Sequence, residues 1–179
     1  GSVTVPARTV AVFTQAAGER IDPTVTPDPD PDTAQWVASG DGRWWLRYPD
    51  GSYPANERVV RDGVTYSFDA NGWMKTGWQV EDGAWRYYAP SGAMASGWTA
   101  VGGTWYYLDP DTGAMATGWL KDGDTWYYLR SSGAMASGWV NLGGAWFYLN
   151  GNGSMATGWA NLGGTWYYLT ESGQMAIGW

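Results

Sequence analysis

The chain has 179 residues, including 27 glycines, 15 tryptophans and 12 tyrosines, and it has no cysteine and no histidine. Without these two side chains, Ser-His-Asp, Cys-His and zinc-hydrolase mechanisms are excluded, and only carboxylate chemistry is left. The formal net charge of −7 disfavours binding to phosphate backbones, so a cationic ligand is favoured. No apolar run approaches the length of a membrane span, and we expect neither a span nor a signal peptide.

Four segments follow one another along the chain. Residues 1–21 contain a β-prone run at 2–13, which we interpret as the remnant of a preceding β domain. Residues 22–33 alternate proline with acidic residues and predict a stiff, extended linker. Residues 34–78 contain degenerate repeats, for which we expect a capping role. Residues 79–179 contain five regular repeats of about 20 residues.

Three residue series define the repeat. Gly-Trp dipeptides recur in steps of 20 or 21 residues, ending at Trp78, Trp98, Trp119, Trp139, Trp159 and Trp179. A second tryptophan follows each of the first five by seven residues, at Trp85, Trp105, Trp126, Trp146 and Trp166. A methionine precedes every Gly-Trp, at Met74, Met94, Met115, Met135, Met155 and Met175. Such a short, fixed period predicts a repeat protein.

One repeat illustrates the predicted local structure. Thr104–Leu108 is aromatic and β-branched and predicts a strand, and a shorter strand is expected around Ser96–Thr99. The glycines between them supply the positive φ that a tight hairpin turn needs. Because an isolated hairpin of this size encloses no core, neighbouring repeats must bury one another. The predicted fold is therefore all-β, a β-solenoid of stacked hairpins.

Alternation along the strand gives each repeat two aromatic faces, since Trp105 and Tyr107 point one way while Tyr106 and Leu108 point the other. Packing between repeats alone explains regular aromatics, but such packing would tolerate Leu, Ile and Val. Repeated Trp and Tyr beside a thioether instead favour a cage for a quaternary ammonium group, which the π faces attract. Several weak cages facing a repeating polymer would gain avidity of about two to four orders of magnitude.

Residues 102–108, Gly-Gly-Thr-Trp-Tyr-Tyr-Leu, and 91–98, Ser-Gly-Ala-Met-Ala-Ser-Gly-Trp, resemble the choline-binding (cell-wall-binding) repeats of bacterial surface proteins and autolysins. The resemblance extends over residues 34–179. It implies a left-handed β-solenoid with choline between consecutive repeats. It also implies a non-catalytic, secreted module that attaches a larger protein to choline on teichoic or lipoteichoic acids at the bacterial cell wall.

The resemblance further implies the binding residues. Each site takes both tryptophans of one repeat with the second strand tyrosine and the methionine of the next. The four complete sets are Trp78, Trp85, Tyr107 and Met115; Trp98, Trp105, Tyr128 and Met135; Trp119, Trp126, Tyr148 and Met155; and Trp139, Trp146, Tyr168 and Met175. Trp159 and Trp166 form a possible half-site that a homodimer through the C-terminal repeat would complete.

The degenerate repeats depart from this pattern. Arg58 and Thr65 replace the two tryptophans of one repeat, so we expect no site ahead of Tyr87. Ser67 replaces the second strand tyrosine, which predicts that Trp36 and Trp44 lack a third ring. We therefore expect the binding sites to lie in the regular repeats.

Other interpretations stay open. Residues 4–13 resemble the last strands of the C-terminal β domain in pullulanase-type amylase-family glycosidases, which implies a parent enzyme that cuts α-glucans. A carbohydrate-binding module that stacks glucan rings is therefore the main alternative, and a purely structural spacer is another. We expect no catalytic residues, metal ligands or cofactors. The candidate carboxylates are interpreted as solvated turn residues, and they are Asp109, Asp111, Asp122, Asp124 and Glu171.

Overall fold

The computed structural model describes residues 29–178. The predicted β-domain remnant, most of the predicted linker and Trp179 lie outside these residues. The chain divides into two compact units. The first unit runs to Gln79 and includes Tyr88–Met94, and the second consists of Val80–Tyr87 and the residues from Ala95 onward. Each unit is described by itself below.

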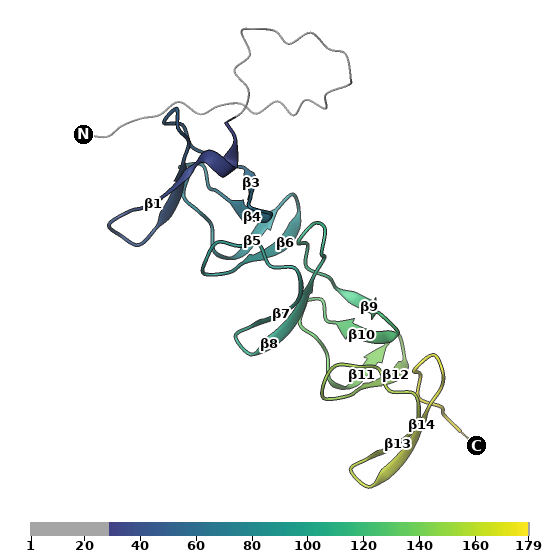
Figure 1. Cartoon of the computed structure of the whole chain (residues 1–179). Coiled ribbons are helices and arrows are strands. Elements are labelled where there is room, and N and C mark those ends of the chain that lie inside the picture. Colours follow the sequence, from purple (N-terminus) through teal and green to yellow (C-terminus); the bar gives the residue numbers. More distant parts are fainter. Residues whose placement is uncertain (1–28, 179) are drawn as a thin grey trace, which may run out of the picture. The chain divides into compact units, whose positions relative to one another are not determined.

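The described residues form fourteen strands, one short 3-10 helix, η1, and no α-helix. η1 spans Pro31–Thr33. The strands in the order of Figure 1 are β1 Gln35–Ala38, β2 Trp44–Arg47, β3 Arg58–Arg61, β4 Val64–Ser67, β5 Gly77–Glu81, β6 Ala84–Tyr88, β7 Gly97–Val101, β8 Thr104–Leu108, β9 Gly118–Asp122, β10 Thr125–Leu129, β11 Gly138–Leu142, β12 Ala145–Leu149, β13 Gly158–Leu162 and β14 Thr165–Leu169. Within residues 29–178, no helix is long and apolar enough to cross a bilayer.

Each strand pairs only with its neighbour in the sequence, which gives seven two-stranded sheets. In the β7–β8 hairpin, Val101 lies opposite Thr104, and the turn between them consists of Gly102 and Gly103 with φ values of 58° and 81°. Two consecutive residues with positive φ fit the type I′ turn that joins tightly twisted strands. The predicted strand Thr104–Leu108 and the all-β hairpin fold are confirmed, and the shorter strand runs on to Val101.

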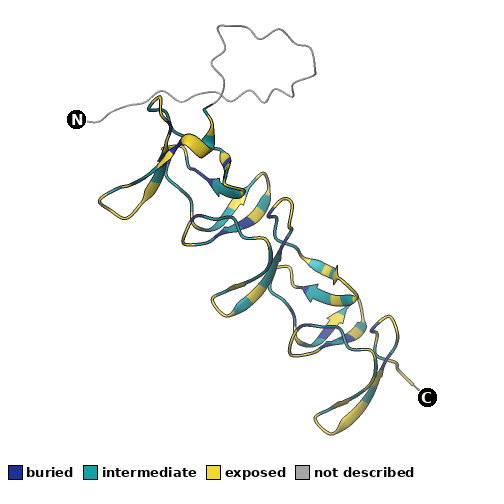
Figure 2. Cartoon of the chain, in the orientation of Figure 1, coloured by how far each residue is buried: buried dark blue, intermediate teal, exposed yellow. Residues whose placement is uncertain are grey.

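The buried core of the second unit is a row of leucines, one from each hairpin. The last residue of each second strand is fully buried, at Leu108, Leu129, Leu149 and Leu169. Each of these leucines forms an isolated antiparallel bridge with the methionine that follows it in the chain, as Leu129 does with Met135. The hairpin tips remain exposed (Figure 2). Val140 and Phe147 add to this core in the β11–β12 hairpin, and every repeat depends on its neighbours for the rest of its burial.

Successive repeats are joined by a backbone hydrogen bond that recurs in register. The methionine N–H of one repeat donates to the carbonyl oxygen of the strand tryptophan in the repeat before it. The N···O distances are 2.8 Å for Met115 to Trp85, 2.8 Å for Met135 to Trp105, 2.7 Å for Met155 to Trp126 and 2.7 Å for Met175 to Trp146. Because the same bond is made at every step, the tryptophan and methionine series stay aligned along the second unit.

The first unit has a core of its own, made of Ala34, Leu46, Tyr48, Val59 and Phe68. The end of the predicted linker contributes to this unit, because the Asp62 N–H donates to Asp32 Oδ1 at 2.9 Å, next to β3. Residues 31–33 therefore form η1 and contact the first unit instead of extending away from it.

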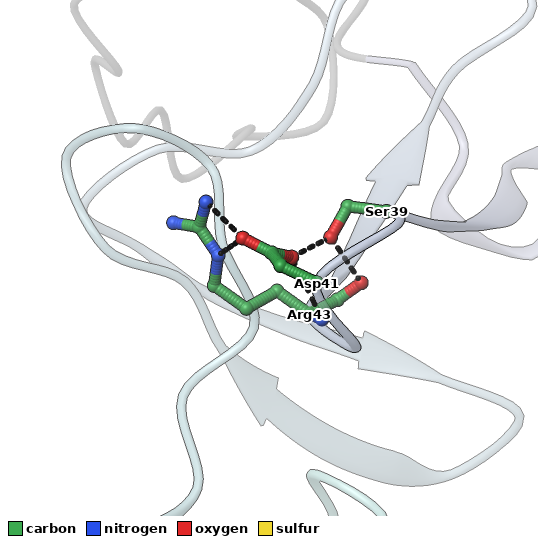
Figure 3. A network of polar contacts seen from close by, with 3 residues as sticks. All are labelled: Ser39, Asp41 and Arg43. Carbon is green, nitrogen blue, oxygen red and sulfur yellow. Dashed lines mark hydrogen bonds and ion pairs between the residues drawn. The ribbon is translucent and has the colours of Figure 1, made fainter.

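The turn between β1 and β2 is held by the polar network of Figure 3. Asp41 accepts hydrogen bonds from the Ser39 hydroxyl and from Arg43 Nε, the latter at 2.7 Å. These bonds, those from Arg43 first, hold the pKa of Asp41 well below its ordinary value. The Arg43 guanidinium also lies 3.9 Å from the centroid of the Trp73 ring. The network thus orders the turn from which Trp44 enters β2.

Gly153 should be intolerant of a side chain for a reason specific to the repeat. Its φ is +86°, and a Cβ built on it would lie 2.3 Å from the Sδ of Met135 in the preceding repeat. Gly158 is the matched control, since its φ is +75° but no atom lies within 4 Å of its Cβ position. We expect Gly158→Ala to cost about 1–2 kcal/mol for the left-handed backbone.

Gly153→Ala should cost about 1–3 kcal/mol more, because the added methyl displaces the Met135 thioether. Urea denaturation followed by circular dichroism measures the difference. Equal losses in the free energy of unfolding for the two variants would show that the Met135 side chain moves aside without cost. The contact would then not contribute to the packing between repeats.

Candidate functional site

The Gly-Trp tryptophans are packed between two repeats. The Trp119 ring centroid lies 5.2 Å from Tyr128 in its own hairpin and 4.9 Å from Phe147 in the next. Trp139 repeats this arrangement, with 5.2 Å to Tyr148 and 4.9 Å to Tyr167. All four contacts have interplanar angles of 67–69°, which is the edge-to-face geometry that aromatic pairs prefer. These rings therefore serve as packing between repeats.

The strand tryptophans are more exposed than the Gly-Trp tryptophans of the same hairpins, although Trp119 is itself 37% exposed. The exposed fraction is 46% for Trp105 and 41% for both Trp126 and Trp146. Trp126 and Trp146 meet the Gly-Trp ring of their own hairpin at 6.3 Å, with the planes nearly perpendicular. A series of half-exposed indoles on a regular scaffold is the kind of apolar surface that marks a binding site.

Backbone hydrogen bonds connect these open tryptophans to the methionine of the next repeat, and the alanine after that methionine to the tyrosine of the same repeat. In the second predicted set, the Met135 N–H donates to the Trp105 carbonyl, and the Ala136 N–H donates to the Tyr128 carbonyl, both at 2.8 Å. The third and fourth sets show the same two bonds, with Ala156 N–H on Tyr148 and Ala176 N–H on Tyr168. The structure thus brings strand tryptophan, methionine and tyrosine together in each of these sets.

The tyrosine rings lie differently from the sequence interpretation. Within the second unit, Tyr128 forms its ring contact with Trp119 of its own hairpin and with neither tryptophan of the preceding repeat. The ring that reaches Trp98 from the following repeat is Tyr127, at 4.7 Å. Strand alternation places Tyr127 on the face opposite Trp126 and Tyr128, so the signal for this contact was present in the sequence. The predicted sites used only one face of the strand.

The first and last sets are less complete. Trp85, Tyr107 and Met115 belong to the second unit, where the Met115 N–H donates to the Trp85 carbonyl, while Trp78 belongs to the first unit. At the other end, Trp159 and Trp166 are 57% and 63% exposed, more than the corresponding tryptophans of the preceding repeats.

A charged group touches the Gly-Trp ring of Trp98 in the second unit. The Trp98 Nε1–H donates to Asp122 Oδ2 at 2.9 Å, and Asp122 is the last residue of β9 in the following hairpin. Leu142 and Leu162 occupy the same position in β11 and β13. Lys121, the residue before Asp122 in β9, lies across from Trp126 in the strand pairing. The electrostatic surroundings therefore differ from one repeat to the next.

The Asp109 carboxylate is hydrogen-bonded within its own turn. Asp109 accepts hydrogen bonds from the Thr112 hydroxyl and N–H, both at 2.8 Å, and these bonds lower the pKa of Asp109. This is the bonding of a turn residue, as the sequence interpretation expected for Asp109. The part of the chain that the structure describes contains no cluster of three or more metal-ligating side chains.

The degenerate repeats require a correction. Ser67 was expected to leave Trp36 and Trp44 without a third ring, yet Tyr66 lies 4.9 Å from Trp36. Both tryptophans, Tyr66 and Met74 line a cavity of about 330 Å³ that is completed by Pro90 and Ser91. The third ring comes from the residue before Ser67, which occupies the same strand position as Tyr127. The expectation was wrong because it followed the tyrosine on the other face of the strand.

Comparison with known proteins gives one family. The model of the choline-binding repeat matches residues 57–97, 95–137 and 136–178. Choline-binding protein J (CbpJ) of Streptococcus pneumoniae has a solved structure that is 45% identical, covering 79% of this chain and 51% of that one, with a TM-score of 0.73. Choline-binding protein F (CbpF) of Streptococcus pneumoniae, solved with a peptidoglycan analogue, is 43% identical with the same coverage and TM-score.

A third structure is the pneumococcal cell wall endolysin of phage Cp-1, solved with choline. It is 38% identical to this chain, and the match covers 74% of this chain and 39% of the endolysin, with a TM-score of 0.52. This chain thus spans about half the length of the two pneumococcal choline-binding proteins and less of the endolysin. No protein with a curated description matches the chain.

Proposed function

The chain belongs to the choline-binding repeat family, and from that premise we propose that it binds quaternary ammonium groups, choline above all, between its successive repeats. The observation that carries the proposal is the row of half-exposed strand tryptophans, each bonded through its carbonyl to the methionine of the next repeat. The Gly-Trp ring is held by packing against the next repeat, and the backbone bond fixes the methionine next to the strand tryptophan in the fold.

The proposed binding residues within the second unit are the last three sets named from the sequence and Trp85, Tyr107 and Met115 of the first set, with one addition. Tyr127, Phe147 and Tyr167 hold the Gly-Trp ring of the preceding repeat in place, so they position the cage that this ring helps to form. Each ring that faces a cation contributes about 0.5–2 kcal/mol. Three such rings correspond to dissociation constants of about high micromolar to millimolar for free choline.

Weak single sites suit attachment to a polymer that repeats the same head group. Linked sites gain about two to four orders of magnitude in avidity when their spacing lets several bind at once. We therefore propose that the module attaches a secreted protein to choline-bearing teichoic or lipoteichoic acid at a bacterial cell surface. The formal net charge of −7 fits a cationic partner. The attached protein is proposed to be an α-glucan-degrading enzyme on the resemblance of residues 4–13 alone.

Carbohydrate binding is the second candidate. Open indole faces also stack sugar rings, and Asn141 and Asn161 lie across from Trp146 and Trp166 in the strand pairing, where an amide would meet a sugar hydroxyl. The two candidates differ in the charge of the ligand. An ammonium ligand depends on the ring quadrupole, whereas a stacked sugar does not need a charge.

Titration of the whole chain separates the two candidates. We expect choline to shift the tryptophan fluorescence saturably at micromolar to millimolar concentrations. The uncharged isostere of choline, in which carbon replaces the ammonium nitrogen, should bind at least about tenfold more weakly because it loses the cation–π attraction. A saturable response to maltooligosaccharides with none to choline would contradict the proposal and support the carbohydrate candidate.

Trp105→Leu should remove one site and leave the fold intact. Trp105 is nearly half exposed, so its loss should shift the thermal midpoint little. Methionine methyl signals in NMR spectra report the sites one at a time. We expect the Met135 methyl to lose its response to choline while Met155 and Met175 keep theirs. Trp105→Phe retains a ring and should retain a weaker response at Met135.

An unchanged Met135 response in Trp105→Leu would show that this tryptophan serves only for packing. The signals of Met155 and Met175 act as the internal control for folding, because both belong to later repeats of the same unit.

Asp122→Asn should weaken the Trp98 site selectively. Asparagine keeps an acceptor for the Trp98 indole N–H but removes the negative charge beside the ring. We expect the half-saturation concentration of choline at Met135 to rise about two- to fivefold at low salt, with a smaller rise at high salt because exposed charges are screened. Asp124→Asn, in the adjacent turn, is the control for the loss of net charge. Equal effects of the two variants would contradict a local role for Asp122.

A further inference from the structure

A second aromatic pocket lies in the first unit, in repeats that have lost the consensus sequence. Its aromatic lining consists of Trp36, Trp44 and Tyr66, with Met74 beside them and Pro90 and Ser91 at the edge. Both tryptophans precede residue 57, where the family match begins. Neither the sequence motif nor the family match therefore assigns a site here.

The pocket reproduces the geometry of the regular repeats. Trp36 and Tyr66 have centroids 4.9 Å apart at 66°, against 4.7 Å at 62° for Trp98 and Tyr127. The Met74 N–H donates to the Trp44 carbonyl at 2.8 Å, the same bond that links Met135 to the strand tryptophan before it. Trp44 is 44% exposed, close to the strand tryptophans of the second unit.

We propose that this pocket is an additional binding site for a quaternary ammonium group. The inference rests on the proposed function, because it assigns to the pocket the ligand class proposed for the regular repeats. A cavity of about 330 Å³ is at the lower end of the range for small-molecule sites, which suits a compact head group. Three ring faces and a thioether offer π attraction with few hydrogen-bonding groups, and this favours a methylated ammonium over a sugar.

Arg61 makes this site weaker than the others. It is the last residue of β3, the position that Asp122 occupies in β9. Its guanidinium lies 6.0 Å from the centroid of the Trp36 ring and therefore competes for the same quadrupole. The Nη1 atom of Arg61 is buried without a hydrogen-bond partner, and its Nε pairs only with the exposed carboxylate of Asp62 at 3.6 Å, so replacing this side chain by leucine should cost little stability. Leucine occurs at the equivalent positions 142 and 162.

The next gap along the first unit provides an internal negative control. There the Met94 N–H donates to the carbonyl of Thr65, so the backbone bond is kept while the tryptophan is replaced. Thr65 has no ring to face a cation. The Met94 methyl should therefore stay silent when choline is added, although its backbone surroundings match those of Met74.

Methyl NMR of the whole chain labelled at methionine tests the proposal, with the six signals assigned by single Met→Leu variants. We expect Met74 to shift saturably with choline, at a higher half-saturation concentration than Met135, and Met94 not to shift. Trp44→Leu should abolish the Met74 response. Arg61→Leu should lower the half-saturation concentration at Met74 about two- to fivefold.

The outcomes separate this proposal from the proposed function. If Met135, Met155 and Met175 respond while Met74 stays silent in both the wild type and Arg61→Leu, the extra site is refuted and the regular sites stand. If no methionine responds, both proposals fail. If Met74 responds equally to choline and to its uncharged isostere, the pocket binds by apolar fit, and its assignment to a quaternary ammonium is overturned.

Discussion

The arrangement of the second unit depends on the backbone hydrogen bond from each of its four methionines to the strand tryptophan of the preceding repeat. A hairpin of about 20 residues cannot enclose a core, and each one contributes a single fully buried leucine such as Leu129. Stability therefore comes from the contacts between repeats. Because the same bond recurs along the second unit, those contacts fall in register, and its gaps between repeats present closely similar sets of aromatic side chains.

The two tryptophans of a repeat differ in how far they are exposed to solvent. Trp139 packs against Tyr148 and Tyr167 and is partly buried, whereas Trp146 keeps 41% of its surface exposed. Leucine would serve as well for a ring that only packed the repeats. The greater exposure of the strand ring is thus the feature that packing does not explain and that the proposed binding of a quaternary ammonium group would use.

The sequence was sufficient for the period, the strands and the turns, since these follow from local rules such as the positive φ at Gly102 and Gly103. It also placed tryptophan and methionine of successive repeats in the same gaps. The contacts of Tyr127 and Tyr66 were not predicted from the sequence, because both faces of the second strand in a regular repeat carry aromatic side chains. Only the packed structure shows which face contacts the neighbouring repeat. The bond between Trp98 and Asp122 spans 24 residues and depends on the repeat-to-repeat arrangement, which no local pattern encodes.

A crystal structure of the chain grown with choline would test the central claim most directly. The account predicts trimethylammonium density against the exposed faces of Trp105, Trp126 and Trp146, next to the thioethers of Met135, Met155 and Met175, with the hairpin backbone unchanged. Rings that close on one another and leave these gaps without a guest at saturating choline would contradict it.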